Sequence, residues 1–318
     1  MEEWAARKLP AGEYFFIWRV NPTVICGRNQ EMDKEVDMAF CREASIDVVR
    51  RKSGGGCVYA DMDNFMFSYV CPGDEVTTTF ARYTTMVAGV LRDMGVEASA
   101  TGRNDILING KKVSGNAFYH LPRRCIAHGT MLYDFDPAVM RRAITPSRAK
   151  LESKAVKSVE SRVTCLTKEG LAMTHEEFER HIIKALCDSE ITLTDSDIAE
   201  IRKIEQTYYL PEFLYRKGEL RPQEAKDADA PNLIRRGGRV EGVGEIYFTI
   251  ILDNEGRIDR IEPSGDFFLA GDPEKHIFRH LRGITLTKEA IAKALPKTDP
   301  ENAIAGLTQD SLSMLLLA

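Results

Sequence analysis

The sequence predicts an α+β protein, with a strand-rich first part, a helical middle and a small mixed unit at the end. Alternating apolar and β-branched runs dominate roughly the first 135 residues. Helical spacing of apolar residues replaces them from about residue 137 onward. Strands and helices that follow one another in separate runs are typical of α+β proteins.

The composition is typical of a soluble globular protein. Of the 318 residues, 43% are hydrophobic and 29% are charged, which is enough apolar mass to build a core. The net charge of -5 gives no bulk positive field, so nucleic acid is not expected as a partner. No apolar run approaches the ~20 residues of a membrane span, and the acidic start is unlike a signal peptide. Seven cysteines without a C-x-x-C pair indicate reduced thiols, and we expect a cytoplasmic protein.

Two pairs of strands are expected near the start of the chain. The runs at 13–20 and 22–29 are separated by the turn signal Asn21-Pro22 and are predicted to pair with each other. The run at 46–51 and the run that begins at Cys57 flank three consecutive glycines in the same manner. We therefore predict a sheet in this region.

The strongest local signals are a hairpin and two helices. Asn109-Gly110 stands between two alternating segments, which predicts a tight two-residue turn. A helix is predicted over 76–94 from its apolar spacing. Another helix is predicted after Thr174, because Glu177 three residues later completes a capping box.

A polar, charged stretch with two prolines at 216–232 predicts a linker. We place a first domain at residues 1–222, the linker at 223–236 and a small α/β domain at 237–318. The last segment carries a hairpin pattern around Asp253–Gly256 and two short helical patterns. A segment of roughly 80 residues can just hold a small core of its own.

The stretch with the clearest chemical signal is "RRKSGGGCVY", at 50–59. Three consecutive glycines in a strand-rich region are costly, because each loses backbone entropy and packs no side chain. Since Arg51 and Ser53 precede them, close approach of bare backbone to a phosphate or carboxylate explains them better than a turn. The spacing matches neither the P-loop nor the dinucleotide-binding pattern. The sequence therefore predicts an anion site of another kind.

A second group of polar residues lies around the Asn109-Gly110 turn. The hairpin would bring Asp105 and Lys112 close to facing each other. A surface ion pair, worth ~0–1 kcal/mol, would explain this pair if it stood alone. The small residues at 114–117 favour a binding site instead, because a planar ligand could lie close to them. His128 follows in the next apolar run, although a lone histidine is more often structural than catalytic.

Four segments of the chain resemble lipoate-protein ligases of the two-domain, cytoplasmic type. In the order of that family they are "RRKSGGGCVYADMDN", "GRNDILINGKKVSGNA", "HGTMLYDFD" and "SVESRVTCL". The resemblance spans nearly the whole chain, and the linked motifs are specific where each alone would be weak. It implies a mixed-sheet catalytic domain of the biotin/lipoyl ligase type, distantly similar to class II aminoacyl-tRNA synthetases, with a small C-terminal accessory domain.

The resemblance also implies a reaction in two steps. Lipoate and Mg-ATP would give lipoyl-adenylate (lipoyl-AMP) and pyrophosphate, and a specific lysine of a lipoyl domain would then attack the mixed anhydride. ATP and Mg2+ are the implied cofactors, and lipoate is the implied substrate. The implied partners are lipoyl-domain proteins, namely E2 subunits of 2-oxoacid dehydrogenases and the glycine cleavage H protein. We expect a monomer that binds neither nucleic acid nor membrane.

The resemblance assigns roles to matching positions of this sequence. Lys112 matches the family's essential lysine, where a cation can hold the lipoate carboxylate against the α-phosphate. Asp105 matches a polar contact to the nucleotide or to Mg2+. The implied lipoate-binding positions are Arg51, Ser53, Gly54, Gly55, Gly56 and His128, and the implied ATP- or AMP-binding positions are Val58, Tyr59, Asn64, Asp105, Ser114 and Ala117.

Two residues depart from the family pattern, and both follow the glycines. Ala60 stands where the family commonly has histidine, which alters a contact to the dithiolane end or to the loop. Asp63 replaces the usual glycine before Asn64, although aspartate tolerates left-handed backbone better than most residues. The chain also begins at a point similar to the middle of the family's first helix.

Two alternative functions remain compatible with the sequence, and a third is disfavoured. An octanoyltransferase of related fold would move an acyl chain through a cysteine thioester without ATP, with Cys57 and Cys125 as the nearby thiols. A non-catalytic paralogue would only bind lipoyl domains or the acyl-adenylate. A biotin ligase would have a different glycine-rich pattern. Pyrophosphate release and acceptor modification separate these functions from one another.

Overall fold

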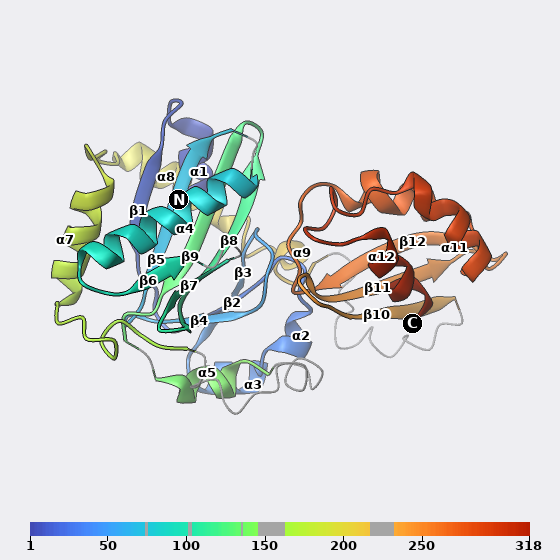
Figure 1. Ribbon diagram of the computed structural model, residues 1–318, viewed down its shortest axis with the longest axis horizontal. Coiled ribbons are helices and arrows are strands. Elements are labelled where there is room, and N and C mark those ends of the chain that lie inside the picture. The colour runs from blue at the N-terminus through green and yellow to red at the C-terminus, as the bar shows by residue number, and fades with distance from the viewer. Residues whose placement is uncertain (74–75, 101–103, 135, 146–162, 217–231) are drawn as a thin grey trace.

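Three β-sheets form the framework of the protein (Figure 1). The structure is a computed structural model that describes residues 1–73, 76–100, 104–134, 136–145, 163–216 and 232–318. A large sheet has six strands in the order β1-β5-β9-β8-β7-β6. Two sheets of three strands each have the orders β3-β2-β4 and β10-β11-β12. With helices packed beside these sheets, the predicted α+β class is confirmed.

The six-stranded sheet is antiparallel throughout. Its strands are β1 (Tyr14–Trp18), β5 (Phe65–Pro72), β9 (Arg124–Met131), β8 (Lys111–Leu121), β7 (Asp105–Ile108) and β6 (Ala98–Ala100). The predicted hairpin is confirmed, because Ile108 pairs with Lys111 across the turn. Asn109 and Gly110 have φ angles of 51° and 76°. Positive φ at both central residues gives a type I′ turn, whose twist matches that of the strands.

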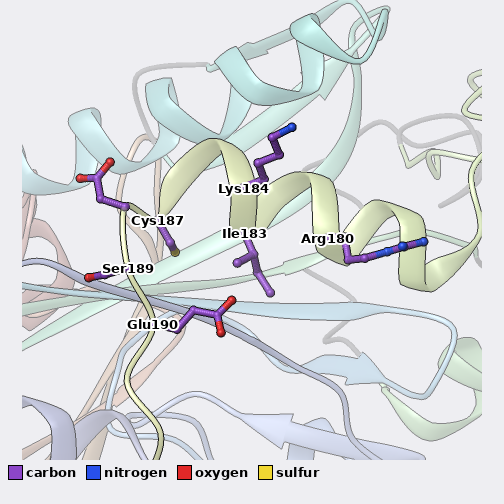
Figure 2. A pocket seen from close by; sticks show the side chains of 7 residues that line it. Arg180, Ile183, Lys184, Cys187, Ser189 and Glu190 are labelled. Atoms are coloured by element: carbon purple, nitrogen blue, oxygen red, sulfur yellow. The ribbon is translucent and has the colours of Figure 1, made fainter.

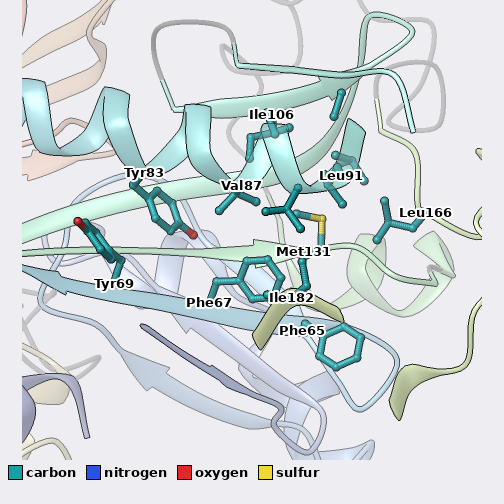
Figure 3. Close-up of a cluster of buried hydrophobic side chains, with 14 of the residues drawn as sticks. Phe65, Phe67, Tyr69, Tyr83, Val87, Leu91, Ile106, Met131, Leu166 and Ile182 are labelled. Carbon is teal, nitrogen blue, oxygen red and sulfur yellow. The ribbon is translucent and has the colours of Figure 1, made fainter. Parts of the chain in front are cut away.

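The main core lies between one face of this sheet and α4 (Val76–Asp93), as Figure 3 shows. The predicted helix over 76–94 is confirmed, and its residues Phe80, Val87 and Leu91 are all buried. They contribute to the same core as Phe67 of β5. The apolar spacing of the sequence therefore identified the face of the helix that packs on the sheet.

The same core includes α7 (His175–Leu186). The predicted capping box is confirmed at its start, where the Thr174 hydroxyl and the Glu177 carboxylate each accept a backbone N–H bond. Phe178 is fully buried, with its ring centroid 5.0 Å from that of Phe65. Truncation of such a residue to alanine costs ~3–5 kcal/mol, so α7 is firmly anchored.

Another helix, α1 (Glu2–Lys8), packs on the opposite face of the six-stranded sheet. Trp4 and Ala5 form a cluster there with Val70 of β5 and Ile126 of β9. Within the described ranges, the other helices before the C-terminal sheet are α2 (Met32–Glu35), α3 (Met38–Glu43), α5 (Pro137–Ala143), α8 (Asp195–Gln206) and α9 (Pro211–Leu214). No helix in the described ranges is long and apolar enough to cross a membrane.

The second sheet shows that the predicted strand pairs are wrong. β2 (Thr23–Cys26) is central, with β3 (Asp47–Arg50) parallel on one side and β4 (Val58–Ala60) antiparallel on the other. Strand β1 therefore does not pair with β2, and β3 does not pair with β4. A parallel pair requires a crossover, which α2 and α3 provide between β2 and β3. The Asn21-Pro22 segment leads the chain from one sheet to another instead of closing a hairpin.

The C-terminal unit, residues 232–318, is built around the third sheet. Its strands β10 (Leu233–Val240), β11 (Gly244–Leu252) and β12 (Ile258–Gly265) are antiparallel, and the predicted hairpin joins β11 to β12. The predicted short helices are present as the π-helical turn Glu274–Phe278 with α10 (Arg279–Leu281) and as α11 (Lys288–Ala294). The sequence analysis missed α12 (Gln309–Leu317), whose leucines lie in this unit's own core.

The expected linker ends too late in the sequence. Residues 233–236 belong to β10, because Leu233 and Ile234 begin the strand and Ile234 packs on the core of the C-terminal unit. The strand start was missed because the charged residues Arg235 and Arg236 interrupt its apolar pattern. Residues 217–231 of the expected linker lie outside the described residues. The division into domains itself stays a prediction.

A partly buried carboxylate, Glu31, joins the C-terminal unit to the first part of the chain. It accepts hydrogen bonds from Arg235 Nη1 at 2.6 Å and Ser264 Oγ at 2.7 Å, and it also pairs with Lys34. Burial alone would raise the pKa of Glu31, but these hydrogen bonds outweigh burial and lower the pKa from 4.5 to about 2. The carboxylate is therefore charged at neutral pH and holds the two parts together.

We expect Glu31→Gln to lower the free energy of unfolding at neutral pH by about 2 kcal/mol, because charged hydrogen bonds are lost. A lowered pKa stabilises the folded state above the ordinary value of 4.5, and this stabilisation is lost as pH falls toward about 2. The variant should therefore have a flatter stability profile over this range, measured by thermal unfolding. Glu255→Gln, which breaks an exposed ion pair with Arg257, is the control. An equal loss of unfolding free energy in both variants would contradict the role of Glu31 in joining the two parts of the chain.

Candidate active site

The glycine-rich loop between β3 and β4 is held by the guanidinium of Arg51. Its Nε donates to Ser53 Oγ at 3.0 Å, and Nη1 donates to Ile25 O at 2.9 Å. Nη2 donates to Gly54 O at 2.6 Å and to Gly56 O at 2.8 Å. Burial lowers the pKa of Arg51 to about 10, so the group stays charged at neutral pH. These four bonds use four of the five N–H groups of the guanidinium.

The glycines of the loop allow the C-terminal unit to approach the backbone. A Cβ atom at Gly54 would lie 2.3 Å from Phe267 O, and Gly55 has a φ of +86°. Gly55 N–H donates to Phe267 O at 3.2 Å. The neighbouring Phe268 stacks on Phe118 of β8 with ring centroids 5.6 Å apart. The loop thus exposes bare backbone, and in this structure the Gly55 N–H donates to the C-terminal unit.

A chain of hydrogen bonds leads from the loop to His128 on β9 and on to Glu2 on α1. Ser53 Oγ lies 2.6 Å from His128 Nε2, and His128 Nδ1 lies 2.8 Å from Glu2 Oε1. Because Ser53 Oγ accepts from Arg51, its hydroxyl hydrogen is available to donate to Nε2. A carboxylate can only accept, so Nδ1 carries a hydrogen. The network therefore selects the Nδ1–H tautomer of the neutral imidazole.

The sequence analysis missed Glu2, which has three hydrogen-bonding neighbours. Its carboxylate accepts from Ser68 Oγ at 2.6 Å and from the Tyr119 hydroxyl at 3.2 Å, in addition to His128. Burial alone would raise the pKa of Glu2, but attraction to His128 and hydrogen bonds from His128 and Ser68 outweigh burial and lower it. Acidic residues at a helix start ordinarily favour the helix dipole and face water, so no sequence signal marked Glu2 as a partner of His128.

A second polar cluster lies at the β7–β8 hairpin. Lys112 Nζ is 2.7 Å from Asp105 Oδ1, and the two side chains are 37% and 30% exposed. The predicted proximity of these residues is confirmed. A Cβ atom at Gly115 would lie 2.6 Å from Lys112 Nζ, so the ammonium folds over the glycine. The cluster therefore presents a cation to solvent above bare backbone.

The two clusters lie on the same face of the six-stranded sheet. Ala117 of β8 is directly opposite His128 of β9, and Gly115 is directly opposite Thr130. Directly opposed residues of an antiparallel pair share a face, and so do residues two apart along a strand. Gly115 and Ala117 are about 7 Å apart along β8. One ligand of moderate length could therefore reach both clusters.

Ser114 is placed differently from the other predicted residues. It is directly opposite Met131, which belongs to the core under α4, so its side chain lies on the other face from Ala117. Its hydroxyl donates to Asn116 Oδ1 at 3.2 Å. The structure therefore does not bring the Ser114 side chain to the Lys112 cluster.

The turn after β4 carries the predicted residue Asn64, which is buried. Asn64 Nδ2 donates to Asp61 Oδ1 at 2.8 Å, while Asn64 Oδ1 has no hydrogen-bond partner within the described part of the chain. A buried acceptor without a hydrogen bond destabilises the folded state unless a ligand or water donates to it. Asp63 is not among the described non-glycine residues with positive φ, so aspartate fits this turn without a left-handed conformation.

Val58 and Tyr59 lie in adjacent positions on β4 and contribute to different clusters. Val58 packs against an apolar group of Ile25, Ala60 and Met66, between the small sheet and the large one. Tyr59 lies in the cluster on the other side of the small sheet. Ala60, the departure noted in the sequence, is fully buried in the apolar group.

Other features of the structure lie apart from these clusters. A cavity of about 330 Å3 at the end of α7 is lined by residues such as Arg180 and Glu190, and none of the predicted site residues lines it (Figure 2). No group of three potential metal-binding side chains occurs among the residues that the structure describes. The segment "SVESRV", at 158–163, lies almost wholly outside the described residues.

Known proteins identify the class to which this fold and these clusters belong. Residues 1–187 match the family profile of the lipoyl protein ligase A/B catalytic domain. The chain is 34% identical over 280 residues to lipoate–protein ligase 1 of Staphylococcus aureus. The matched region covers 86% of this chain and 81% of that protein. It is 30% identical over 327 residues to lipoate-protein ligase LplJ of Bacillus subtilis, with coverages of 99% and 95%. These matches define an enzyme of the ligase class. The chain belongs to the lipoate-protein ligase family.

Solved structures share the fold. P. falciparum LipL1 in complex with lipoate has a TM-score of 0.72 at 22% identity and covers 96% of this chain and 87% of that one. Another similar structure comes from an archaeal lipoylation system, a bipartite lipoate protein ligase and its E2 lipoyl domain from Thermoplasma acidophilum. Its TM-score is 0.61 at 25% identity, and the match covers 69% of this chain and 90% of that one. Lipoate-protein ligase A bound with ATP has a TM-score of 0.59 at 23% identity, and the match covers 68% of this chain and 91% of that one. The predicted family and fold class are confirmed.

We expect Glu2→Gln to disturb the tautomer of His128. The amide oxygen of the variant lacks the negative charge that favours Nδ1–H, and the amide NH2 group cannot accept from the Tyr119 hydroxyl. Nitrogen NMR of the imidazole in weakly alkaline buffer should show Nδ1–H in the native protein and a mixture in the variant. We also expect a loss of stability of about 1–3 kcal/mol.

Glu3→Gln is the matched control, because Glu3 pairs with Arg7 and Lys52 and makes no bond to His128. It should leave the imidazole signals unchanged. An unaltered tautomer in Glu2→Gln would show that Glu2 does not determine the state of His128.

Proposed function

We propose that this protein activates lipoate with Mg-ATP to lipoyl-adenylate and pyrophosphate, and then transfers the lipoyl group to a specific lysine of a lipoyl domain. Family membership supports this proposal, as do the relatives described with lipoate and with ATP. The observation that carries it is the Lys112–Asp105 pair, which lies on the same sheet face as His128.

Lys112 is the residue proposed to act in catalysis. An ammonium above the bare backbone of Gly115 can contact the lipoate carboxylate and the α-phosphate together. Such a cation neutralises the charge that develops as the carboxylate attacks phosphorus and as the mixed anhydride is later cleaved. Holding the two reactants in line is itself a large part of such catalysis. The site therefore needs no protein nucleophile.

The glycine-rich loop, with Arg51, Ser53 and His128, is proposed to bind the acyl group. Thr130 and Met66 continue the sheet face on which His128 lies, and Met66 belongs to the apolar group with Ile25 and Ala60. An apolar acyl chain would be stabilised against this group. The Gly55 N–H could then bind an acyl or phosphate oxygen once it releases Phe267 O.

The nucleotide is proposed to contact the turn after β4 and the start of β8. The unpartnered Asn64 Oδ1 fits an amino donor of the adenine ring. Val58 and Ala117 are further predicted contacts, and Tyr59 and Ser114, whose side chains face other clusters, are proposed to contribute backbone groups alone. Asp105 is the carboxylate proposed for Mg2+, which in nucleotide sites is held by one or two carboxylates together with the phosphates. When bound, Mg2+ neutralises phosphate charge, while Asp105 also positions Lys112.

The second step is proposed to need only the bound acyl-adenylate and the acceptor lysine. The proposed acceptors are E2 subunits of 2-oxoacid dehydrogenases and the glycine cleavage H protein, with the enzyme acting as a cytoplasmic monomer. The cysteine-thioester route is not favoured. A hydrogen bond with Cys26 and burial raise the pKa of the Cys57 thiol, and Cys125 is buried. Neither thiol is thus activated as a nucleophile.

One assay tests the proposed reaction. The protein is incubated with ATP, Mg2+ and lipoate, with and without an apo lipoyl domain, and pyrophosphate and acceptor mass are followed. We expect pyrophosphate in both cases and a lipoylated acceptor in the second. Transfer from octanoyl carrier protein without ATP consumption would refute the proposal, and pyrophosphate without acceptor modification would confine the activity to the first step.

We expect Lys112→Ala to reduce pyrophosphate release roughly hundredfold or more, because the charge at the reacting oxygens is lost. Its side chain is partly exposed, so thermal unfolding should be nearly unchanged. Lys111→Ala is the matched control, since this exposed neighbour has the same charge. An active Lys112→Ala protein, or an equal loss in Lys111→Ala, would refute the assignment.

A further inference from the structure

We propose that Cys26 and Cys57 form a dithiol modification site, which low-molecular-mass disulfides oxidise to an intramolecular disulfide beside the glycine-rich loop. The two Sγ atoms lie 3.2 Å apart and share a hydrogen bond. All seven cysteines of the chain are described and free, so both thiols are reduced in this structure. Neither thiol has a part in the proposed ligase reaction.

The backbone places these two residues in register for a cross-link. On β2 and β4, Val24 is directly opposite Tyr59 and Ile25 is directly opposite Val58. The same register, continued by one residue, places Cys57 opposite Cys26. Directly opposed residues of antiparallel strands have Cα atoms about 4.5–5.5 Å apart. This range lies inside the roughly 4.4–6.8 Å that disulfides span. Closing the bond to about 2.05 Å needs the sulfur atoms to move together by about 1 Å.

The two thiols differ in exposure, which assigns their roles. Cys57 is partly exposed, whereas Cys26 is fully buried. Cys57 thiolate attacks one sulfur of the small disulfide, forming a mixed disulfide and releasing one thiolate. Cys26, after losing its proton to solvent, attacks the Cys57 sulfur and releases the second thiolate. Two protein thiols are thus oxidised while one small disulfide is reduced to two thiols.

The surroundings of Cys57 make this exchange slow at neutral pH. The hydrogen bond with Cys26, burial and the nearby Glu35 raise the pKa of the Cys57 thiol, while Arg51 opposes them. Only a small fraction is thiolate, so we expect oxidation over minutes to hours. The site would therefore respond to sustained oxidising conditions.

A cross-link here would act directly on the loop. Cys57 follows Gly56, whose carbonyl accepts from Arg51 Nη2, and the Cys26 carbonyl accepts from the Arg51 backbone N–H at 3.0 Å. The disulfide would thus join the two segments that Arg51 already holds together. It would fix the end of the glycine-rich loop against the end of β2.

The test uses oxidised glutathione as the probe on the full-length protein. After incubation for hours, remaining thiols are alkylated in denaturant, and peptides are analysed by mass spectrometry. We expect a linked Cys26–Cys57 peptide that disappears after reduction with dithiothreitol. Cys26→Ser should instead retain one glutathionyl group on Cys57, and Cys57→Ser should leave Cys26 free. Cys187→Ser, which removes the other partly exposed thiol, should not change the cross-link.

Two results would overturn the proposal. One is full alkylation of both Cys26 and Cys57 in the native sequence after oxidation. The other is a cross-link of either residue to a different cysteine, such as the buried Cys41. Because the readout is a covalent bond, this test succeeds or fails independently of the ligase assay.

Discussion

The rest of the site depends on the hydrogen bonds that the guanidinium of Arg51 donates to the glycine-rich loop. The segment between β3 and β4 has no regular structure, and three of its residues are glycines that pack no side chain. One partly buried cation compensates by donating to Ser53 and to the carbonyls of Ile25, Gly54 and Gly56. A planar fork with several donors suits this arrangement, whereas a lysine ammonium is a compact point charge.

Arg51 also links the loop to two other parts of the molecule. On one side, Ser53 continues the hydrogen-bond chain through His128 to Glu2 on α1. On the other side, Gly55 N–H donates to Phe267 O of the C-terminal unit. A ligand that takes the Gly55 donor must therefore displace the carbonyl of Phe267. Binding at the loop and contact with the C-terminal unit compete for the same backbone group.

The sequence predicted best the features that depend on neighbouring residues. Asn109-Gly110 defines its own turn, Thr174 and Glu177 cap a helix locally, and the hairpin fixes the approach of Lys112 to Asp105. Pairing between distant segments was harder to predict. The small sheet depends on a crossover through α2 and α3, and α12 has consecutive leucines without a clear polar face.

The residues of the candidate site differ in the same way in how far sequence patterns mark them. The glycine-rich loop, Lys112 and His128 carry local patterns, and family resemblance added their roles. Glu2 could not be found in this way, because it reaches His128 only when α1 packs across the sheet. Nor could the sequence show that Phe267 would meet Gly54 and Gly55, since more than 200 residues separate them. Both contacts are products of tertiary packing.

Replacing Arg51 by lysine is the sharpest test of the role of the guanidinium, because it keeps a positive charge and removes the planar fork. Hydrogen exchange of the 53–57 amides and pyrophosphate release with lipoate and ATP would be measured on the same sample. We predict faster exchange in this segment, unchanged exchange in β11, and at least tenfold slower pyrophosphate release, which corresponds to about 1.4 kcal/mol. Native exchange and a native rate in the variant would contradict the role of Arg51 as the group that holds the loop.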